Sequence, residues 1–246
     1  MMNRWLRCLV RKFRRFAAAG ADLPRRSLAS RIGEIFALVA LAWVAVTPHA
    51  VAQSAALDIE GRYEVLQPPQ QTETGNRIEV VEVFWYGCPH CYTFLPMIEA
   101  YELVKPEYVE IRRLPAIFRE SWAAHARAFH TAMLLGVVDQ THRPLFDEIH
   151  AQRNPTDHKE ALAAFFERQG VDRGTFEQTW DSFAVESLVR KSILMQQRYG
   201  VTGTPSVVVN GKYRVTGRLA GSYDNVIPVV MALVEKEREA QQGASN

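Results

Sequence analysis

Hydrophobic and polar residues recur along the chain with two different periods, and the period separates strands from helices. β-branched and aromatic side chains fill residues 77–86 (RIEVVEVFWY), which predicts a buried central strand. Residues 108–114 (YVEIRRL) alternate apolar and polar side chains, as a strand does. A short strand is predicted around residues 63–66, and the polar, proline-rich residues 67–76 form the loop that follows it. These segments predict a sheet in the first third of the chain.

The helical period dominates the middle of the chain. Residues 89–105, 121–136 and 183–199 each predict a helix. Asp157 is followed three residues later by Glu160, which is the spacing of a capping box and predicts the start of a further helix. About 80 residues, from 119 to about 200, therefore read as helical without an intervening strand.

Strand signals return near the C-terminus. Two short strands, 206–209 and 213–216, flank Asn210-Gly211-Lys212, which is a hairpin turn signal. Residues 228–239 predict a last helix. The order of elements indicates an α/β layer structure interrupted by a helical insertion.

The first 52 residues have the parts of a secretory signal. A basic region precedes the apolar run 35–47, and Ala50-Val51-Ala52 provides a cleavage pattern. Thirteen helical residues span about 20 Å, less than the roughly 30 Å of a membrane core. We therefore expect a cleaved signal peptide, with a signal-anchor as the alternative. Cys8 lies in this leader without a lipobox-like context, so it is not a candidate site residue.

Charge is distributed unevenly along the 246 residues. The leader holds nine Lys and Arg residues and two acidic ones, which leaves 20 basic and 25 acidic residues after position 52. A mildly acidic body argues against nucleic-acid binding, because contacts with phosphate need concentrated basic residues. An apolar fraction of 48% indicates an ordinary globular core.

Two cysteines remain after the leader, in the motif Cys88-Pro89-His90-Cys91. The motif follows the predicted central strand and opens a helix, where Pro89 suits the first turn. Cys88 then faces free N–H groups at the helix start, which stabilise a thiolate, and His90 adds a donor or a positive charge beside it. Cys91, one turn later, is close enough to form a small disulfide with Cys88.

This cysteine pair has two other interpretations. Half of a zinc site is disfavoured because zinc takes four ligands, and the histidines show no paired spacing beyond His125 and His130. An inert structural disulfide is the second. A strand, a CxxC motif and a helix in this order favour redox exchange, with no cofactor besides the Cys88–Cys91 disulfide.

The motif resembles the thioredoxin superfamily and, within it, the DsbA-like family of periplasmic disulfide oxidases. CPHC is the pattern of that family, and three other segments are similar to it: 133–146 (MLLGVVDQTHRPLF), 179–189 (TWDSFAVESLV) and 200–213 (GVTGTPSVVVNGKY). The resemblance covers about residues 61–238. It implies a thioredoxin-like α/β fold with an inserted all-helical domain.

The resemblance also implies roles for individual residues around the motif. Cys88 is expected to be the exposed attacking thiol and Cys91 the buried resolving thiol. Pro205 is expected to be a cis-proline packed against the sulfurs, and Thr204, just before it, to contact substrate. Thr204 stands where many members of the family carry valine.

A buried acid precedes the first cysteine of the family by six residues, which is Glu82 here. Glu82 interrupts an apolar run and is costly to bury unless it is paired or useful. A glutamate at a solvated strand end is the alternative. The lysine that partners this acid in the family corresponds to Arg113, which stays charged and so cannot carry a proton.

The function implied is that of a periplasmic thiol:disulfide oxidoreductase that donates its disulfide to unfolded exported proteins. A DsbB-like membrane quinone reductase would reoxidise it, and a monomer is expected. A disulfide isomerase or reductase is the alternative within the fold, although residues 53–76 are too few for the dimerisation domain of an isomerase. A non-catalytic, chaperone-like binding module is the alternative outside redox chemistry.

The expected organisation follows from these assignments. It comprises a leader, a thioredoxin-like part, a helical insertion, a second thioredoxin-like part and a flexible tail, at residues 1–52, 53–118, 119–186, 187–240 and 241–246.

Overall fold

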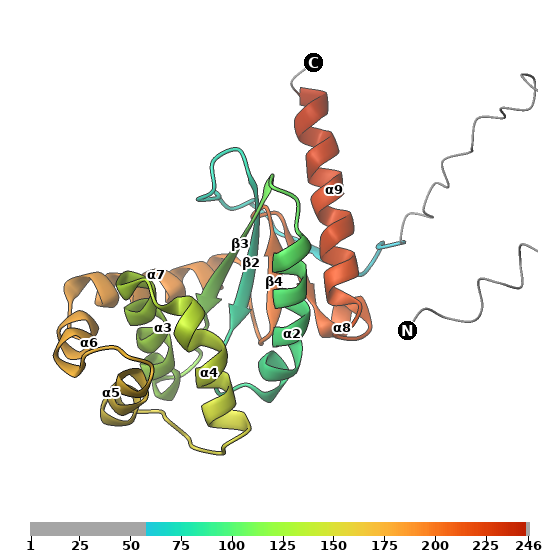
Figure 1. Cartoon of the computed structure of the whole chain (residues 1–246). Coiled ribbons are helices and arrows are strands. Elements are labelled where there is room, and N and C mark those ends of the chain that lie inside the picture. Colours follow the sequence, from blue (N-terminus) through green and yellow to red (C-terminus); the bar gives the residue numbers. More distant parts are fainter. Residues whose placement is uncertain (1–57, 245–246) are drawn as a thin grey trace, which may run out of the picture. The chain divides into compact units, whose positions relative to one another are not determined.

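A five-stranded mixed sheet forms the centre of the computed structural model, which describes residues 58–244 (Figure 1). Its strands lie in the order β1-β5-β4-β2-β3, and their bounds are Glu64–Val65, Tyr213–Thr216, Ser206–Val209, Ile78–Phe84 and Val109–Pro115. β2 pairs with β3 in parallel, and the other neighbours are antiparallel. A parallel pair needs a crossover connection, which α2 supplies between β2 and β3.

The helices divide into those that cover the sheet and those inserted between β3 and β4. Their bounds are Pro89–Val104 (α2), Glu120–Trp122 (the 3-10 helix η1), Ala123–Leu135 (α3), Val138–His150 (α4), Lys159–Arg168 (α5), Arg173–Trp180 (α6), Phe183–Arg198 (α7), Gly217–Ala220 (α8) and Val226–Ala244 (α9). In Figure 1, α2 and α9 lie beside the strands, whereas α3 to α7 gather at one end of the sheet. The predicted thioredoxin-like α/β fold with a helical insertion is confirmed.

The central strand β2 is buried along its whole length and divides the core into two parts. Side chains alternate between the two faces of a strand. Ile78, Val80 and Phe84 belong to the cluster that includes the buried side chains of α2 and α9. Val81 and Val83 belong to a second cluster on the opposite face. By this alternation, Glu82 lies on the face covered by α2.

The predicted hairpin turn is present between β4 and β5. The Lys212 N–H donates to the Val209 carbonyl oxygen at 2.9 Å, and Asn210 and Gly211 both have positive φ. Positive φ at both central residues matches the right-handed twist of the flanking strands. Gly211 also packs against the carbonyl oxygen of Gln70, so this turn contacts the loop between β1 and β2.

Three boundaries differ from the predictions. β1 has only two residues. α5 is capped at His158 without a side-chain hydrogen bond, and Asp157 instead contacts the His158 ring at 3.1 Å, so the predicted capping box is wrong. α9 continues to Ala244, so residues 241–244 are helical rather than a flexible tail, because the final turns extend beyond the apolar stripe that marked the helix.

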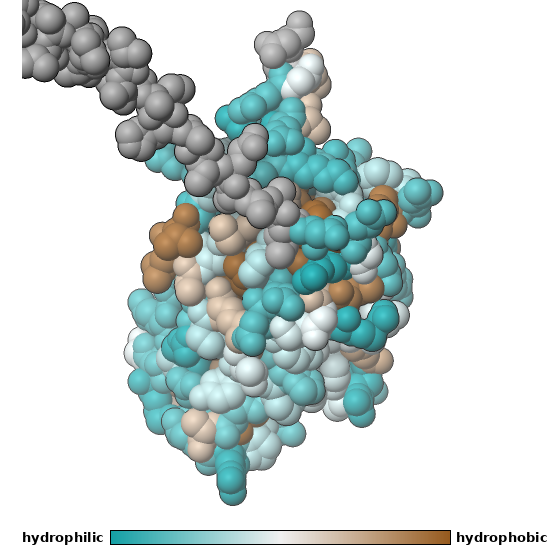
Figure 2. Space-filling view, turned by 90° about the vertical axis from the view of Figure 1, so that its right-hand side faces the viewer, coloured by the Kyte–Doolittle hydropathy of each residue, from teal (hydrophilic) through white to brown (hydrophobic). Residues whose placement is uncertain are grey.

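The surface of the described residues carries no extended hydrophobic area in the view of Figure 2. Figure 2 shows a mainly hydrophilic face on which hydrophobic patches are small and separate. Between residues 58 and 244, no helix combines the length and apolar character needed to cross a membrane. The predicted signal peptide, 1–52, lies outside the described residues, and the domain boundaries at 119 and 187 stay predictions.

Replacing Gly211 with alanine should destabilise the protein more than the same change at Gly136. Both glycines have positive φ, which costs an L-residue about 1–2 kcal/mol. A Cβ at Gly211 would also lie 2.1 Å from the Gln70 carbonyl oxygen, whereas a Cβ at Gly136 meets no atom within 4 Å among the described residues. Denaturant unfolding of both variants measures the difference, and equal losses would contradict the proposed contact.

Candidate active site

The cysteine motif begins where β2 ends. The Cys88 N–H donates to the Trp85 carbonyl oxygen at 3.0 Å, which turns the chain from the strand into α2. Cys88 is the N-cap of α2, and Pro89 occupies its first turn as predicted. The N–H groups of this first turn have no partners within the helix, so they are free to stabilise negative charge.

The two thiols differ in burial. Both are free cysteines in this structure. Cys91 is fully buried, and Cys88 is 7% exposed. Cys88 is therefore less exposed than predicted, because the surrounding residues cover most of it, but it remains the more accessible sulfur.

The pKa values of the two thiols are shifted in opposite directions. A hydrogen bond from Cys91 lowers the pKa of Cys88 to about 5, and the Thr204 side chain and the backbone N–H groups of Cys91 and His90 add to this effect against burial. Burial raises the pKa of Cys91, and the neighbouring Cys88 raises it further. At neutral pH the pair therefore holds a Cys88 thiolate and a protonated Cys91.

His90 acts on Cys88 through its backbone rather than through its ring. Its ring stacks with Tyr223 at a centroid distance of 5.4 Å, and its backbone N–H contributes to the lowered pKa of Cys88. Burial raises the pKa of Tyr223, and the negative charge of Cys88 raises it further, which places this tyrosine beside the thiols. Tyr223 was not identified from the sequence, because no motif connects it to the cysteines.

The loop before β4 forms the other side of the site. The Thr204–Pro205 peptide bond is cis, as the resemblance implied, and Pro205 is buried. In the protonated form, the Cys88 thiol donates to the Thr204 carbonyl oxygen at 3.4 Å. Ser206 stabilises the loop by donating to the Gly203 carbonyl oxygen at 2.7 Å. Thr204 therefore contacts the reactive sulfur directly.

Glu82 is fully buried, so the alternative of a solvated strand end is wrong. Burial raises its pKa to about 7, against the opposing effect of Arg113, whose Nε lies 3.5 Å from the carboxylate. Arg113 also pairs with Glu102 at 2.5 Å. Within the part of the chain that the structure describes, neither carboxylate oxygen of Glu82 has a hydrogen-bond partner. The predicted pairing of Glu82 with Arg113 is present.

The two histidines considered as zinc ligands have other partners. His125 Nε2 lies 3.1 Å from the Thr156 carbonyl oxygen, and His130 Nε2 lies 2.8 Å from the Ser192 hydroxyl. Among residues 58–244, no group of three or more His, Cys, Asp or Glu side chains is arranged to hold a metal ion. These contacts tie α3 to its neighbours.

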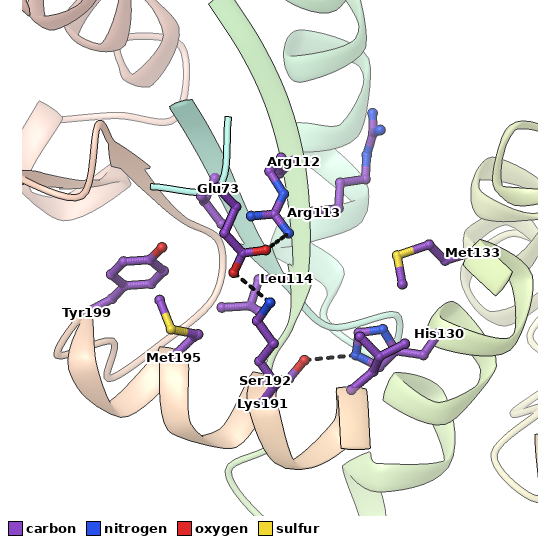
Figure 3. A pocket seen from close by; sticks show the side chains of 12 residues that line it. Glu73, Arg112, Arg113, Leu114, His130, Met133, Lys191, Ser192, Met195 and Tyr199 are labelled. Atoms are coloured by element: carbon purple, nitrogen blue, oxygen red, sulfur yellow. Dashed lines mark hydrogen bonds and ion pairs between the residues drawn. The ribbon is translucent and has the colours of Figure 1, made fainter. Parts of the chain in front are cut away.

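Two of the hollows between residues 58 and 244 differ in their relation to the cysteines. One adjoins the reactive loop, with Thr204, Pro205 and Tyr223 in its lining. The other lies between β3, α3 and α7, where Glu73 points between Arg112 and Lys191 (Figure 3). Of these two, the first has residues of the Cys88 region in its lining, so it is the one relevant to thiol chemistry.

Replacing Thr204 with valine should raise the pKa of Cys88 by about one unit. The change removes a hydroxyl that stabilises the thiolate, and one unit corresponds to ~1.4 kcal/mol. Titration of the thiolate ultraviolet absorbance measures the pKa. Thr202→Val, an exposed position on the same loop, is the control and should leave the pKa unchanged. An unaltered pKa in Thr204→Val would rule out a contribution from the hydroxyl.

Comparison with known proteins bears on this site. A thiol:disulfide interchange protein DsbA from Azotobacter vinelandii is 41% identical over 166 residues, which are 68% of this chain and 78% of the relative. The DsbA of Pseudomonas aeruginosa is 39% identical over 178 residues, 72% of this chain and 84% of the relative. Both alignments span more than three quarters of the relative.

Solved structures of DsbA proteins are also similar to this chain. The crystal structure of Pseudomonas aeruginosa DsbA superposes with a TM-score of 0.71 at 38% identity, covering 74% of this chain and 95% of that one. The oxidoreductase DsbA from Xylella fastidiosa gives 0.68 at 30% identity, covering 72% and 96%. The protein is therefore a thiol:disulfide oxidoreductase. Since residues 79–224 also match the model of the DSBA-like thioredoxin domain, the chain belongs to that family.

Proposed function

We propose that the protein is an oxidant of the periplasm that donates a Cys88–Cys91 disulfide to exported proteins. The observation that carries the proposal is the contrast between the two thiols, a stabilised thiolate at Cys88 and a protonated, buried Cys91. A sulfur of low pKa is a good leaving group. A disulfide that contains such a sulfur is readily transferred to another protein.

The reaction proceeds by two exchanges. A substrate thiolate attacks the Cys88 sulfur, and the bond to Cys91 breaks as Cys91 takes up a proton. A second substrate thiolate then attacks the substrate sulfur of the mixed disulfide, and Cys88 leaves as a thiolate. Two substrate thiols become one disulfide, the protein disulfide becomes a thiolate and a thiol, and one proton is released.

Glu82 is proposed as the group that exchanges a proton with Cys91. It lies on the face of β2 that α2 covers, and a pKa of about 7 suits a group that both accepts and donates a proton at neutral pH. Arg113 remains charged and holds the carboxylate. Thr204 and Pro205 are proposed to receive an extended substrate segment beside Cys88.

The proposed partners are unfolded exported proteins and, for reoxidation, a DsbB-like membrane quinone reductase. The DsbA names of the relatives and the leader pattern of residues 1–52 support these partners and the periplasmic location. An isomerase or reductase is the second candidate, favoured by Thr204, because threonine before the cis-proline also occurs in disulfide isomerases. A double variant that lacks both Cys88 and Cys91 and still retained full activity in cells would instead favour a chaperone-like binding module.

Replacing Cys91 with alanine should trap covalent complexes between Cys88 and export substrates. The mixed disulfide at Cys88 then lacks the neighbouring thiol that returns the substrate unchanged. Non-reducing electrophoresis of periplasmic extracts, followed by reduction, detects the complexes. Cys88→Ala is the matched control and should trap little, because Cys91 is fully buried. Trapping mainly through Cys91 would reverse the assignment of the two thiols.

The reduced protein should be more stable than the oxidised one at pH 7 and less stable at pH 4. The folded pKa of Cys88, about 5, lies below its unfolded value of about 8.5, so at pH 7 the thiolate contributes ~3 kcal/mol to the reduced form. Closing a four-residue loop stabilises the oxidised form by roughly 2 kcal/mol.

The thiolate contribution is complete above about pH 8.5 and is lost as the pH falls through the folded pKa. Denaturant unfolding of the reduced and oxidised forms at pH 7 and pH 4 measures which form is the more stable at each pH. If the oxidised form is the more stable at both, the protein is a poor oxidant and the isomerase or reductase becomes the better candidate.

A further inference from the structure

Trp85, which precedes the turn that carries Cys88, stacks on a second tryptophan, Trp122. Trp85 follows β2, and by the alternation of the strand its ring belongs on the face opposite α2. This ring stacks on that of Trp122 with centroids 3.8 Å apart and planes 5° from parallel. The guanidinium of Arg119 lies 5.6 Å from the centre of the Trp122 ring. The stack therefore joins the end of the central strand to η1, at the start of the helical segment.

Trp85 is in direct contact with the backbone that leads to Cys88. A Cβ placed on Gly87 would lie 2.4 Å from the Trp85 ring, so the ring occupies the space beneath that glycine. The carbonyl oxygen of Trp85 accepts the Cys88 N–H at 3.0 Å. Trp85 therefore contacts the segment on the N-terminal side of the reactive sulfur through both its ring and its carbonyl group.

Packing, rather than a hydrogen bond, holds the indole of Trp85. Its Nε1 is buried and has no hydrogen-bond partner among the described residues. The ring packs against both hydrophobic clusters of the core. Trp122 is 8% exposed and belongs to the cluster on the face opposite α2. A flat neighbour at van der Waals distance is thus a main constraint on where the Trp85 ring lies.

We propose that Trp122 is a positioning residue for Cys88, acting through Trp85 and Gly87. By holding the Trp85 ring flat beneath Gly87, it fixes the turn that aims the sulfur at its hydrogen-bond donors. The helical segment would thereby set the reactivity of the thiol. This inference rests on the proposed thiol exchange but adds a residue that neither the cysteine motif nor the cis-proline loop includes.

The chemical reason is the directionality of the bonds to the sulfur. The groups that face Cys88 are Cys91 and the backbone N–H of His90 from α2, Thr204 from the loop before β4, and Tyr223 after α8. Hydrogen bonds to an ion are strong but depend on distance and angle. Loss of the stack leaves all of these groups in place and alters only their geometry toward the sulfur.

Trp122→Leu tests the proposal, because leucine keeps an apolar side chain but cannot stack. We expect the pKa of Cys88, followed by thiolate absorbance, to rise by about one unit, which means roughly tenfold less thiolate at a pH below the wild-type pKa. The equilibrium with glutathione should shift in parallel, toward a weaker oxidant. Trp122→Phe, which retains a flat ring, should restore most of the wild-type behaviour.

Trp180→Leu is the matched control. Trp180 is also a tryptophan of the helical segment, is 7% exposed and has an arginine over its ring, 5.9 Å away. Its replacement should cost comparable stability without changing the pKa of Cys88. If Trp122→Leu does not fold, Trp122→Phe is compared with Trp180→Phe. The pKa of Cys88 should then rise in Trp122→Phe, by less than the one unit expected for leucine, and should not rise in Trp180→Phe.

Three outcomes would overturn the inference or its basis in distinguishable ways. Trp122 variants that keep the wild-type pKa and glutathione equilibrium would overturn the positioning role and leave the proposed function intact. An equal shift in the Trp180 variant would show general loosening instead. An ordinary cysteine pKa in the wild-type protein would refute the proposed oxidant function itself, whatever the variants do.

Discussion

The stabilisation of one sulfur anion at the start of α2 is the interaction on which the site depends. A buried or half-buried thiolate is unfavourable unless donors converge on it, and here they come from the second cysteine, the Thr204 side chain and two backbone N–H groups. Each donor requires a different part of the fold to be in place. The helix start needs β2 to end at Phe84, and the threonine needs the loop that enters β4.

The same need for converging donors explains why Cys91, one helical turn later, is a neutral thiol rather than a thiolate. Cys91 lies under the surface with the core side chains of α2, where burial favours the neutral thiol. Glu82 is subject to the same burial on the strand beneath, but Arg113 supplies a counter-charge that brings its pKa back to about 7. Three acidic groups in one small region therefore have three different proton affinities, set by solvent access and by neighbours.

Local patterns were sufficient for much of this arrangement. The apolar run of β2, the CPHC motif and the Asn210-Gly211 turn are contiguous in sequence, and the structure places them as predicted. Contacts between distant segments were not predictable in this way. Tyr223 beside His90 and Trp122 beneath Trp85 depend on how separate elements pack, and a single sequence has no spacing rule for such pairs. The low exposure of Cys88 is likewise not predictable from the motif, because other segments cover the sulfur.

The strict alternation of side chains along β2 has a consequence for how such a protein can vary. Residues at even positions reach the face of Glu82 and α2, and the odd-numbered Trp85 reaches the face of Trp122. The two proposed roles, proton exchange by Glu82 and positioning of Cys88 through Trp122, therefore originate on opposite faces of one strand, although the Trp85 ring packs against the core on both faces. On this proposal, substitutions in the helical segment would tune the oxidising strength of the protein while Glu82 and its counter-charge Arg113 stay in place.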